Sequence, residues 1–193
     1  MKETYRILIP SEYEDLLDAI EKERLRIDIE TLMNTGMRYT ELEYFAKHLK
    51  IFDAKNNAIT LPQEATKTKR ERVIHLTPAF SKRLYQYLRE HKTLDVPCRR
   101  TMDDNLKRWW QCVVALIRYN NLEKDYTDDW YPSTKTFRKS WESCLLAAGY
   151  QSMIVALSQG HSQLISYGYY ANPDPRLKSE MEQVKKLTEG WGT

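Results

Sequence analysis

Apolar side chains recur at three- and four-residue spacing through most of the chain, a pattern that predicts amphipathic helices. The first helix is expected after Pro10, where Ser11 can cap it and Glu14 completes a capping box. A second apolar stripe ends at Gly36, a residue placed to stop that helix. Further helices are expected from Thr40, from Pro78, from a cap at Asp103 or Asp104, over Lys135 to Ala148, over Met153 to Leu157 and over Asp174 to Leu187.

Three short runs have the character of β-strands: residues 49–53, 58–61 and 71–76. The turn-forming pair Asn56-Asn57 separates the first two runs. Together they predict a small three-stranded antiparallel sheet. With the helices, they indicate an α+β fold that is predominantly α-helical.

The connection between the last two runs, residues 65–70, is rich in cations and is expected to form a hairpin tip. In an extended chain, side chains two residues apart point to the same side, so Lys67 and Lys69 are expected to reach one way together. The hairpin then offers a lysine to a site beneath it. The alternative is that these are edge-strand lysines that deter aggregation.

The composition suits one globular domain with a substantial core, since 41% of the 193 residues are hydrophobic and 30% are charged. No run approaches the roughly 20 apolar residues of a membrane span, and the charged N-terminus does not match a signal peptide. An intracellular protein is therefore expected. Cys98, Cys112 and Cys144 are too scattered for a disulfide framework or a zinc site, so we expect reduced core thiols and neither metal nor other cofactor.

The net charge of +3 is unevenly distributed. Residues 1–30 contain nine acidic and five basic residues, so the remainder of the chain carries +7. Such a surface is compatible with a nucleic-acid partner, because neutralising phosphates takes a positive surface on one side only. Candidates for contact with a DNA backbone lie near the start of the helix after Thr101, with simple solvent exposure as the alternative: Arg99, Arg100, Lys107 and Arg108.

The segment from Pro132 to Pro173 holds the densest set of candidate chemical groups. Lys135 and Arg138 lie three residues apart on a predicted helix, so both can address one anion. His161 follows Gly160 in a turn, and a tyrosine cluster begins at Tyr167 and ends at Tyr169-Tyr170. Taken singly, each has a plain structural interpretation; Arg138, for example, can form a salt bridge with Glu142 along its own helix.

Five motifs in order along the chain resemble the catalytic domain of the tyrosine recombinases, the phage integrase family. The resemblance covers about Ser11 to Leu187. The first motif is the arginine box Thr35-Gly36-Met37-Arg38-Tyr39-Thr40-Glu41-Leu42, and the second is the hairpin at Lys67 to Leu76, with Lys67 in the lysine position and Lys69 as its alternate. The third is Lys135-x-x-Arg138, and the fourth is Gly160-His161-Ser162. The fifth is Tyr170, nine residues after that histidine, with Tyr169 as its alternate.

The resemblance implies a metal-independent cleavage and rejoining of DNA strands through a 3′-phosphotyrosine. Arg38 and Arg138 would stabilise the charge on the non-bridging phosphate oxygens, because guanidinium groups bind phosphate in a bidentate manner. Tyr170 would be the nucleophile. Lys67 or Lys69 would be the general acid for the leaving 5′-oxygen, while Lys135 and His161 would assist proton transfer or bind the phosphate.

Two departures from the family pattern shape the expectation. Lysine at position 135, where the family commonly has histidine, resembles the integrases of archaeal viruses and plasmids and also type IB topoisomerases. Residues 1–193 are expected to form a single catalytic domain without the family's N-terminal core-binding domain, either excised or naturally minimal, with a tail helix at 174–187. The tail packs either on its own core or on a neighbouring protomer.

The resulting hypothesis is an integrase that recombines a viral or other mobile element in the cytoplasm of a prokaryotic host, with an archaeal host as the narrower alternative. Its expected partners are double-stranded DNA at attachment sites and further copies of itself, in a tetramer on DNA, with no membrane association. Two alternatives remain open: relaxation of DNA as in a type IB topoisomerase, and a DNA-binding module of recombinase descent that no longer cleaves.

Overall fold

The computed structural model describes residues 6–120, 122, 124, 126, 129–160 and 174–192. The described part is predominantly helical with one small antiparallel sheet, as the sequence predicts. Its α-helices are α1 (Pro10–Asp18), α2 (Glu23–Thr35), α3 (Tyr39–Lys47), α4 (Pro78–His91), α5 (Arg99–Tyr119), α6 (Thr134–Ala147), α7 (Ser152–Gln159) and α9 (Met181–Thr188). Its 3-10 turns are η1 (Leu49–Ile51), η2 (Gln63–Ala65) and η3 (Pro175–Glu180), and its strands are β1 (Phe52–Asp53), β2 (Ala58–Leu61) and β3 (Arg72–His75).

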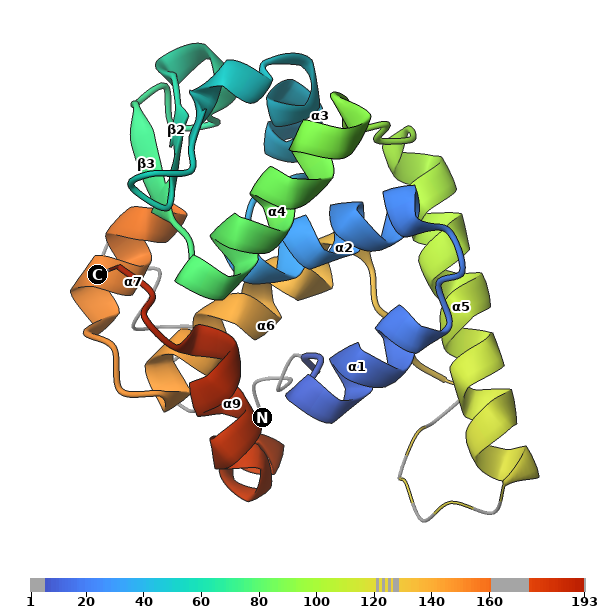
Figure 1. Ribbon diagram of the computed structural model, residues 1–193. Helices are drawn as coiled ribbons and strands as arrows, with labels where there is room; N and C mark the ends of the chain where they lie inside the picture. Colours follow the sequence, from blue (N-terminus) through green and yellow to red (C-terminus); the bar gives the residue numbers. More distant parts are fainter. Residues whose placement is uncertain are drawn as a thin grey trace.

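Helices α2 and α6 cross the middle of the molecule and pack against each other (Figure 1). Both are buried along most of their length, and they supply large core side chains such as Leu32, Met33 and Phe137, none of which is exposed. The sheet lies at one end of this pair, α5 lies along another side, and α1 and α9 lie beneath (Figure 1). The loops at the ends of α2 and α6 are therefore held by a rigid core.

The sheet has the order β1-β2-β3, with all pairs antiparallel. Ile59 pairs with Ile74, and both are fully buried, so this face of the sheet packs on the core. The expected first strand is shorter than predicted because η1 occupies its first three residues. The amide of Phe52 donates to the carbonyl of Leu49 to close that turn.

Three predicted helix caps are wrong. Helix α1 begins at Pro10, one residue before the predicted cap at Ser11, and Glu12 rather than Glu14 is the glutamate that reaches back, to the amide of Ile9 (3.2 Å). Helix α3 begins at Tyr39, one residue before the predicted cap at Thr40. In both, a glutamate at the third helical position accepts from the amide of the residue that precedes the helix, which is the bond that the glutamate contributes to a capping box.

The third wrong cap concerns α5, which begins at Arg99 instead of after Asp103 or Asp104. Asp103 lies inside α5, where its carboxylate accepts from the amide of Thr134 (2.8 Å) and so caps α6. Two predicted boundaries are confirmed. Pro78 opens α4, and Gly36 ends α2 with a φ of 60°, a conformation that glycine adopts without steric cost.

The expectation of core thiols holds for one cysteine only. Cys144 is buried in α6, whereas Cys98 and Cys112 are exposed. The expectation failed because the helical phase of α5 places Cys112 on the opposite side from Trp110 and Val113, and because Cys98 lies just outside the helix.

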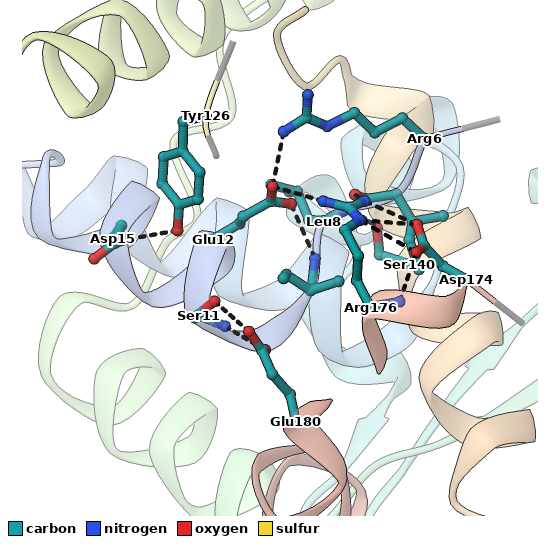
Figure 2. Close-up of polar contacts among 12 residues, drawn as sticks. Arg6, Leu8, Ser11, Glu12, Asp15, Tyr126, Ser140, Asp174, Arg176 and Glu180 are labelled. Carbon is teal, nitrogen blue, oxygen red and sulfur yellow. Dashed lines mark hydrogen bonds and ion pairs between the residues drawn. The ribbon is translucent and has the colours of Figure 1, made fainter. Parts of the chain in front are cut away.

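The chain segment after residue 173 docks on the N-terminal part of the same chain (Figure 2). Glu12, which is 1% exposed, forms ion pairs with Arg6 and Arg176, each at 2.8 Å. Ser11 donates to Glu180 through its amide (3.0 Å) and its hydroxyl. Leu177 and Val184 are buried, so the tail packs on its own core, one of the two predicted arrangements. Its first part is the 3-10 turn η3 rather than α-helix.

Among the described residues, no helix is both long and apolar enough to cross a membrane.

Candidate active site

Arg38 lies in the tight turn between α2 and α3, as the sequence predicts. Gly36 ends α2 in the left-handed conformation, and Arg38 is the residue immediately before α3. Its side chain is 26% exposed, and its Nη1 donates to Glu41 Oε1 (2.7 Å). The rest of its guanidinium makes no hydrogen bond within the described part of the chain. That remainder is available to an anion.

Glu41 is the hub of the site, although no motif assigned it a role. Its side chain has no exposed surface. One oxygen, Oε1, binds Arg38, while Oε2 accepts from the Arg38 amide (2.8 Å) and from Arg72 Nη2 (2.6 Å). A buried carboxylate requires such partners, because an unpaired buried charge is strongly unfavourable. The Glu41 carboxylate therefore holds both the main chain and the side chain of Arg38.

Arg138 meets the Arg38 turn from α6. Its Nη1 donates to the carbonyl of Gly36 (2.9 Å), and its Nη2 donates to the carbonyl of Gln159. Nη1 also lies 4.0 Å from Glu41 Oε2. The residue is 8% exposed, and burial together with the charges of Arg38 and Arg72 lowers its pKa to about 10. The two predicted arginines are thus brought together, an arrangement that a salt bridge to Glu142 alone would not produce.

Arg72 and Gln159 complete the cluster, and sequence reasoning missed both. Arg72 is the first residue of β3, is 7% exposed and donates to Glu41 and to the Gln159 carbonyl. Gln159 is the last residue of α7, and its side chain donates to the carbonyl of Thr35 (3.2 Å). A signal for Arg72 was present, since it alternates with the inward-facing Ile74 on a strand that packs on the core.

Lys67 and Lys69 are both exposed, on the loop that precedes β3. Thr66 closes this loop, because its hydroxyl accepts from the amide of Arg70 (3.1 Å) and donates to the Arg70 carbonyl (2.8 Å). Lys69 has a φ of 54°, in the left-handed region. The expectation that the two lysines extend together on one side assumed an extended chain, whereas the chain here forms a tight turn. The choice between them stays open.

Lys135 lies in the first turn of α6 and is exposed, whereas Arg138 one turn later is buried. The two residues share a helical face but differ in depth. Lys135 is also close enough to Lys139 to help lower the pKa of that residue, after the larger effect of burial. The N-terminal turn of α6 therefore carries an excess of positive charge.

Two hydrogen bonds link the start of α5 to the starts of α3 and α6, the two helices beside which Arg38 and Arg138 lie. The hydroxyl of Tyr39 donates to the carbonyl of Pro97 (2.7 Å), which joins the start of α3 to the segment before α5. Asp103 joins α5 to the start of α6. The positive ends of helix dipoles favour anions. The predicted DNA-contacting residues all lie exposed on the first three turns of α5: Arg99, Arg100, Lys107 and Arg108.

Three arginines around one buried carboxylate leave a net positive charge that is held in place before any ligand arrives. Such preorganised donors stabilise charge that develops on an oxyanion without the cost of reorienting. The site is therefore suited to a phosphate. His161, Tyr169 and Tyr170 lie outside the described residues, so their predicted roles stay predictions.

The chain is similar to known proteins both in its sequence and in its fold. The model of a family described as the phage integrase family matches residues 6–176. No curated protein matches the sequence significantly. Among solved structures, the XerA recombinase is similar with a TM-score of 0.68 and 18% identity over 95% of this chain and 66% of that chain.

Two further structures hold DNA. The Tn1549 transposon integrase, in complex with a circular intermediate DNA, gives a TM-score of 0.62 and 18% identity over 94% of this chain and 67% of that chain. The XerH site-specific recombinase, bound to its difH substrate before cleavage, gives 0.59 and 20% over 94% of this chain and 54% of that chain. The present chain thus spans about one half to two thirds of the length of these proteins.

Proposed function

The chain belongs to the phage integrase family, and we propose on this premise that it is the catalytic domain of a site-specific DNA recombinase. Its substrate is double-stranded DNA, which it cleaves and rejoins without a metal ion through a 3′-phosphotyrosine. The supporting observation is the cluster in which Arg38, Arg72 and Arg138 surround the buried carboxylate of Glu41.

Arg38 and Arg138 stabilise the negative charge on the non-bridging oxygens as phosphorus becomes five-coordinate. Arg38 is the more exposed of the two and makes the first contact. Lys135, on the exposed turn above Arg138, and His161 bind the phosphate or move protons. These groups act together because the core holds α2 and α6 against each other.

Tyr170, with Tyr169 as its alternate, is the nucleophile. Its phenol oxygen bonds to phosphorus as the bond from phosphorus to the 5′-oxygen breaks, and its proton passes to His161 or to solvent. Lys67, with Lys69 as its alternate, gives the proton that the leaving 5′-oxygen takes up. The exposed loop that Thr66 closes gives this lysine the reach for that transfer. The later attack of a 5′-hydroxyl reverses the sequence and rejoins the strand.

The exposed basic residues of α5 position the DNA backbone beside these groups: Arg99, Arg100, Lys107 and Arg108. Four copies assemble on paired attachment sites, in the cytoplasm of an archaeal host whose virus or plasmid carries the element. Lys135 in place of histidine motivates the archaeal assignment. It also makes relaxation of supercoiled DNA, as by a type IB topoisomerase, the second candidate function.

A binding and cleavage experiment separates these functions. Duplexes that bind the protein are selected from a pool with randomised sequence, and the selected duplex is then incubated with the protein in EDTA. A covalent protein–DNA adduct that depends on the selected sequence supports recombination. Relaxation of a supercoiled plasmid without sequence preference would favour the topoisomerase, and salt-sensitive binding without any adduct would leave a DNA-binding module.

A further inference from the structure

Arg72 is a buried arginine whose position requires explanation. It is the first residue of β3 and faces the core with Ile74. A guanidinium keeps its charge at neutral pH, so burial is tolerated only where acceptors surround it. Burial lowers the pKa of Arg72, and the charge of Glu41 opposes that effect. The fold therefore keeps this charge inside at a cost in desolvation.

The two acceptors of Arg72 are those that hold the two phosphate-binding arginines. Its Nη2 donates to Glu41 Oε2 (2.6 Å), and the other oxygen of that carboxylate binds Arg38. Its Nη1 donates to the carbonyl of Gln159 (2.6 Å), the same oxygen that accepts from Arg138. One guanidinium therefore touches a partner of Arg38 and a partner of Arg138.

Arg72 also fits closely against the end of α7. Gly160 has a φ of 65°, and a Cβ placed there would lie 3.2 Å from both Cδ and Nη1 of Arg72. The Gln159 carbonyl lies at the C-terminal end of α7, where the helix dipole favours a cation. The turn that leads to position 161 is thus held against β3 by this side chain.

We propose that Arg72 is a positioning residue for the cleavage reaction: it fixes Arg38 through Glu41, and Arg138 through the Gln159 carbonyl. The inference rests on the proposed function. Arg72 does not bind the phosphate itself, because both of its terminal nitrogens are bonded to protein acceptors and its side chain is 6% exposed. Loss of the Arg72 side chain therefore displaces Arg38 and Arg138, the two residues that stabilise the charge of the phosphate.

The test compares two scissile groups in otherwise identical nicked duplexes of the selected sequence. One carries a normal phosphate, and the other carries a methylphosphonate, in which a methyl group removes the negative charge that arginines stabilise. Arg72→Met and Arg72→Lys are compared with wild type for the rate of adduct formation and the melting temperature. Arg83→Met is the matched control, because Arg83 bridges Glu23 and Glu30 between α4 and α2.

On the phosphate duplex we expect Arg72→Met to react about 10- to 100-fold more slowly than wild type, since small misplacements of reacting groups have effects of this size. On the methylphosphonate the reduction in rate should be several-fold smaller. Arg72→Lys keeps the charge but reaches only one of the two acceptors, so its rate of adduct formation should lie between those of wild type and Arg72→Met. A partly unfolded variant is slowed equally on both duplexes, so the ratio of the two reductions reports positioning alone. Arg83→Met should leave that ratio unchanged.

Equal reductions in rate on the two duplexes, with adduct still formed by wild type, would overturn the proposal for Arg72 and leave the proposed function intact. Failure of wild type to form adduct with either duplex would overturn the proposed function, and the inference would fall with it.

Discussion

Arg38 and Glu41 form an ion pair of 2.7 Å in which the guanidinium is 26% exposed and the carboxylate has no exposed surface. The pair connects the accessible edge of the site to its buried centre, where Glu41 also binds Arg72. Removing the buried charge leaves two guanidiniums facing an amide. We expect Glu41→Gln to lower the free energy of unfolding by about 3–5 kcal/mol, the usual cost of breaking a buried ion pair by losing one partner.

Urea unfolding of Glu41→Gln measures this destabilisation. Glu64→Gln is the matched control, because Glu64 is exposed and accepts a surface hydrogen bond from Tyr44 (3.1 Å). The control should stay within about 0.5 kcal/mol of wild type. A similar small effect for Glu41→Gln would mean that Glu41 does not hold the cluster together.

Periodicity and glycine placement predicted most helices and all three strands, because both depend on local chemistry. The end of α2 at Gly36 and the start of α4 at Pro78 are examples. The predicted starts of α1 and α3 were wrong because Glu12 and Glu41 accept from the amides of Ile9 and Arg38, which places each helix start one residue before the predicted cap. Local rules do not decide which of two neighbouring capping patterns forms.

In the candidate site, too, the residues within local motifs were predicted and those that depend on long-range packing were not. Arg38 and Arg138 were predicted from motif order, and the fold joins Arg138 to the Arg38 turn through the carbonyl of Gly36, which lies 102 residues before Arg138. Arg72 and Gln159 were missed because their partners lie 31 and 124 residues away, respectively. Only packing of β3 and α7 on the core brings these groups together. Alternation of Arg72 with Ile74 was the one local signal.

The buried carboxyl group of Asp28 should make the stability of the protein depend on pH. Its carboxyl is fully buried, and neither oxygen has a hydrogen-bond partner within the described part of the chain. Burial, with a smaller effect of Asp95, raises its pKa to about 8, and Arg24 opposes this. The native protein then retains a proton that the unfolded chain releases above about pH 4. Asp28 therefore lowers stability progressively as the pH rises from about 4 to about 8.

Replacing the ionisable group removes this dependence. We expect Asp28→Asn to raise the free energy of unfolding at pH 8 by on the order of 3 kcal/mol, and the gain to shrink as the pH falls towards 4. Urea unfolding at several pH values measures it, with the exposed Asp104→Asn as control. A gain that is the same at pH 5 and pH 8 would contradict the assignment.

The choice between Lys67 and Lys69 can be made with a substrate whose 5′-bridging oxygen is replaced by sulfur. A thiolate leaves without a proton, so it does not need the general acid. We expect Lys67→Ala to form adduct about 100-fold more slowly than wild type on normal DNA and to regain most of that rate on the sulfur substrate. Lys69→Ala carries the same change two residues away, and its rate of adduct formation relative to wild type should differ little between the two substrates. The reverse pattern would assign the role to Lys69.

The exposed basic residues of α5 predict the salt dependence of DNA binding. Removing one cation that binds a phosphate should reduce the slope of log Kobs against log salt by about 0.9 and weaken binding equally for all sequences. Arg100→Ala and Lys107→Ala are the most direct variants, because the two side chains share one face of α5. Lys186→Ala, an exposed lysine on α9, is the control. Unchanged slopes for both α5 variants would place the DNA elsewhere.

The most direct test of the account is covalent trapping of DNA by the tyrosine predicted as nucleophile. Nicked suicide duplexes of the selected sequence are incubated in EDTA with wild type and with separate Tyr167→Phe, Tyr169→Phe and Tyr170→Phe variants, and adducts are resolved on a denaturing gel. The account predicts an adduct for wild type that disappears only in Tyr170→Phe. An adduct that persists in Tyr170→Phe, or a wild type that binds the duplex and never forms one, would contradict it.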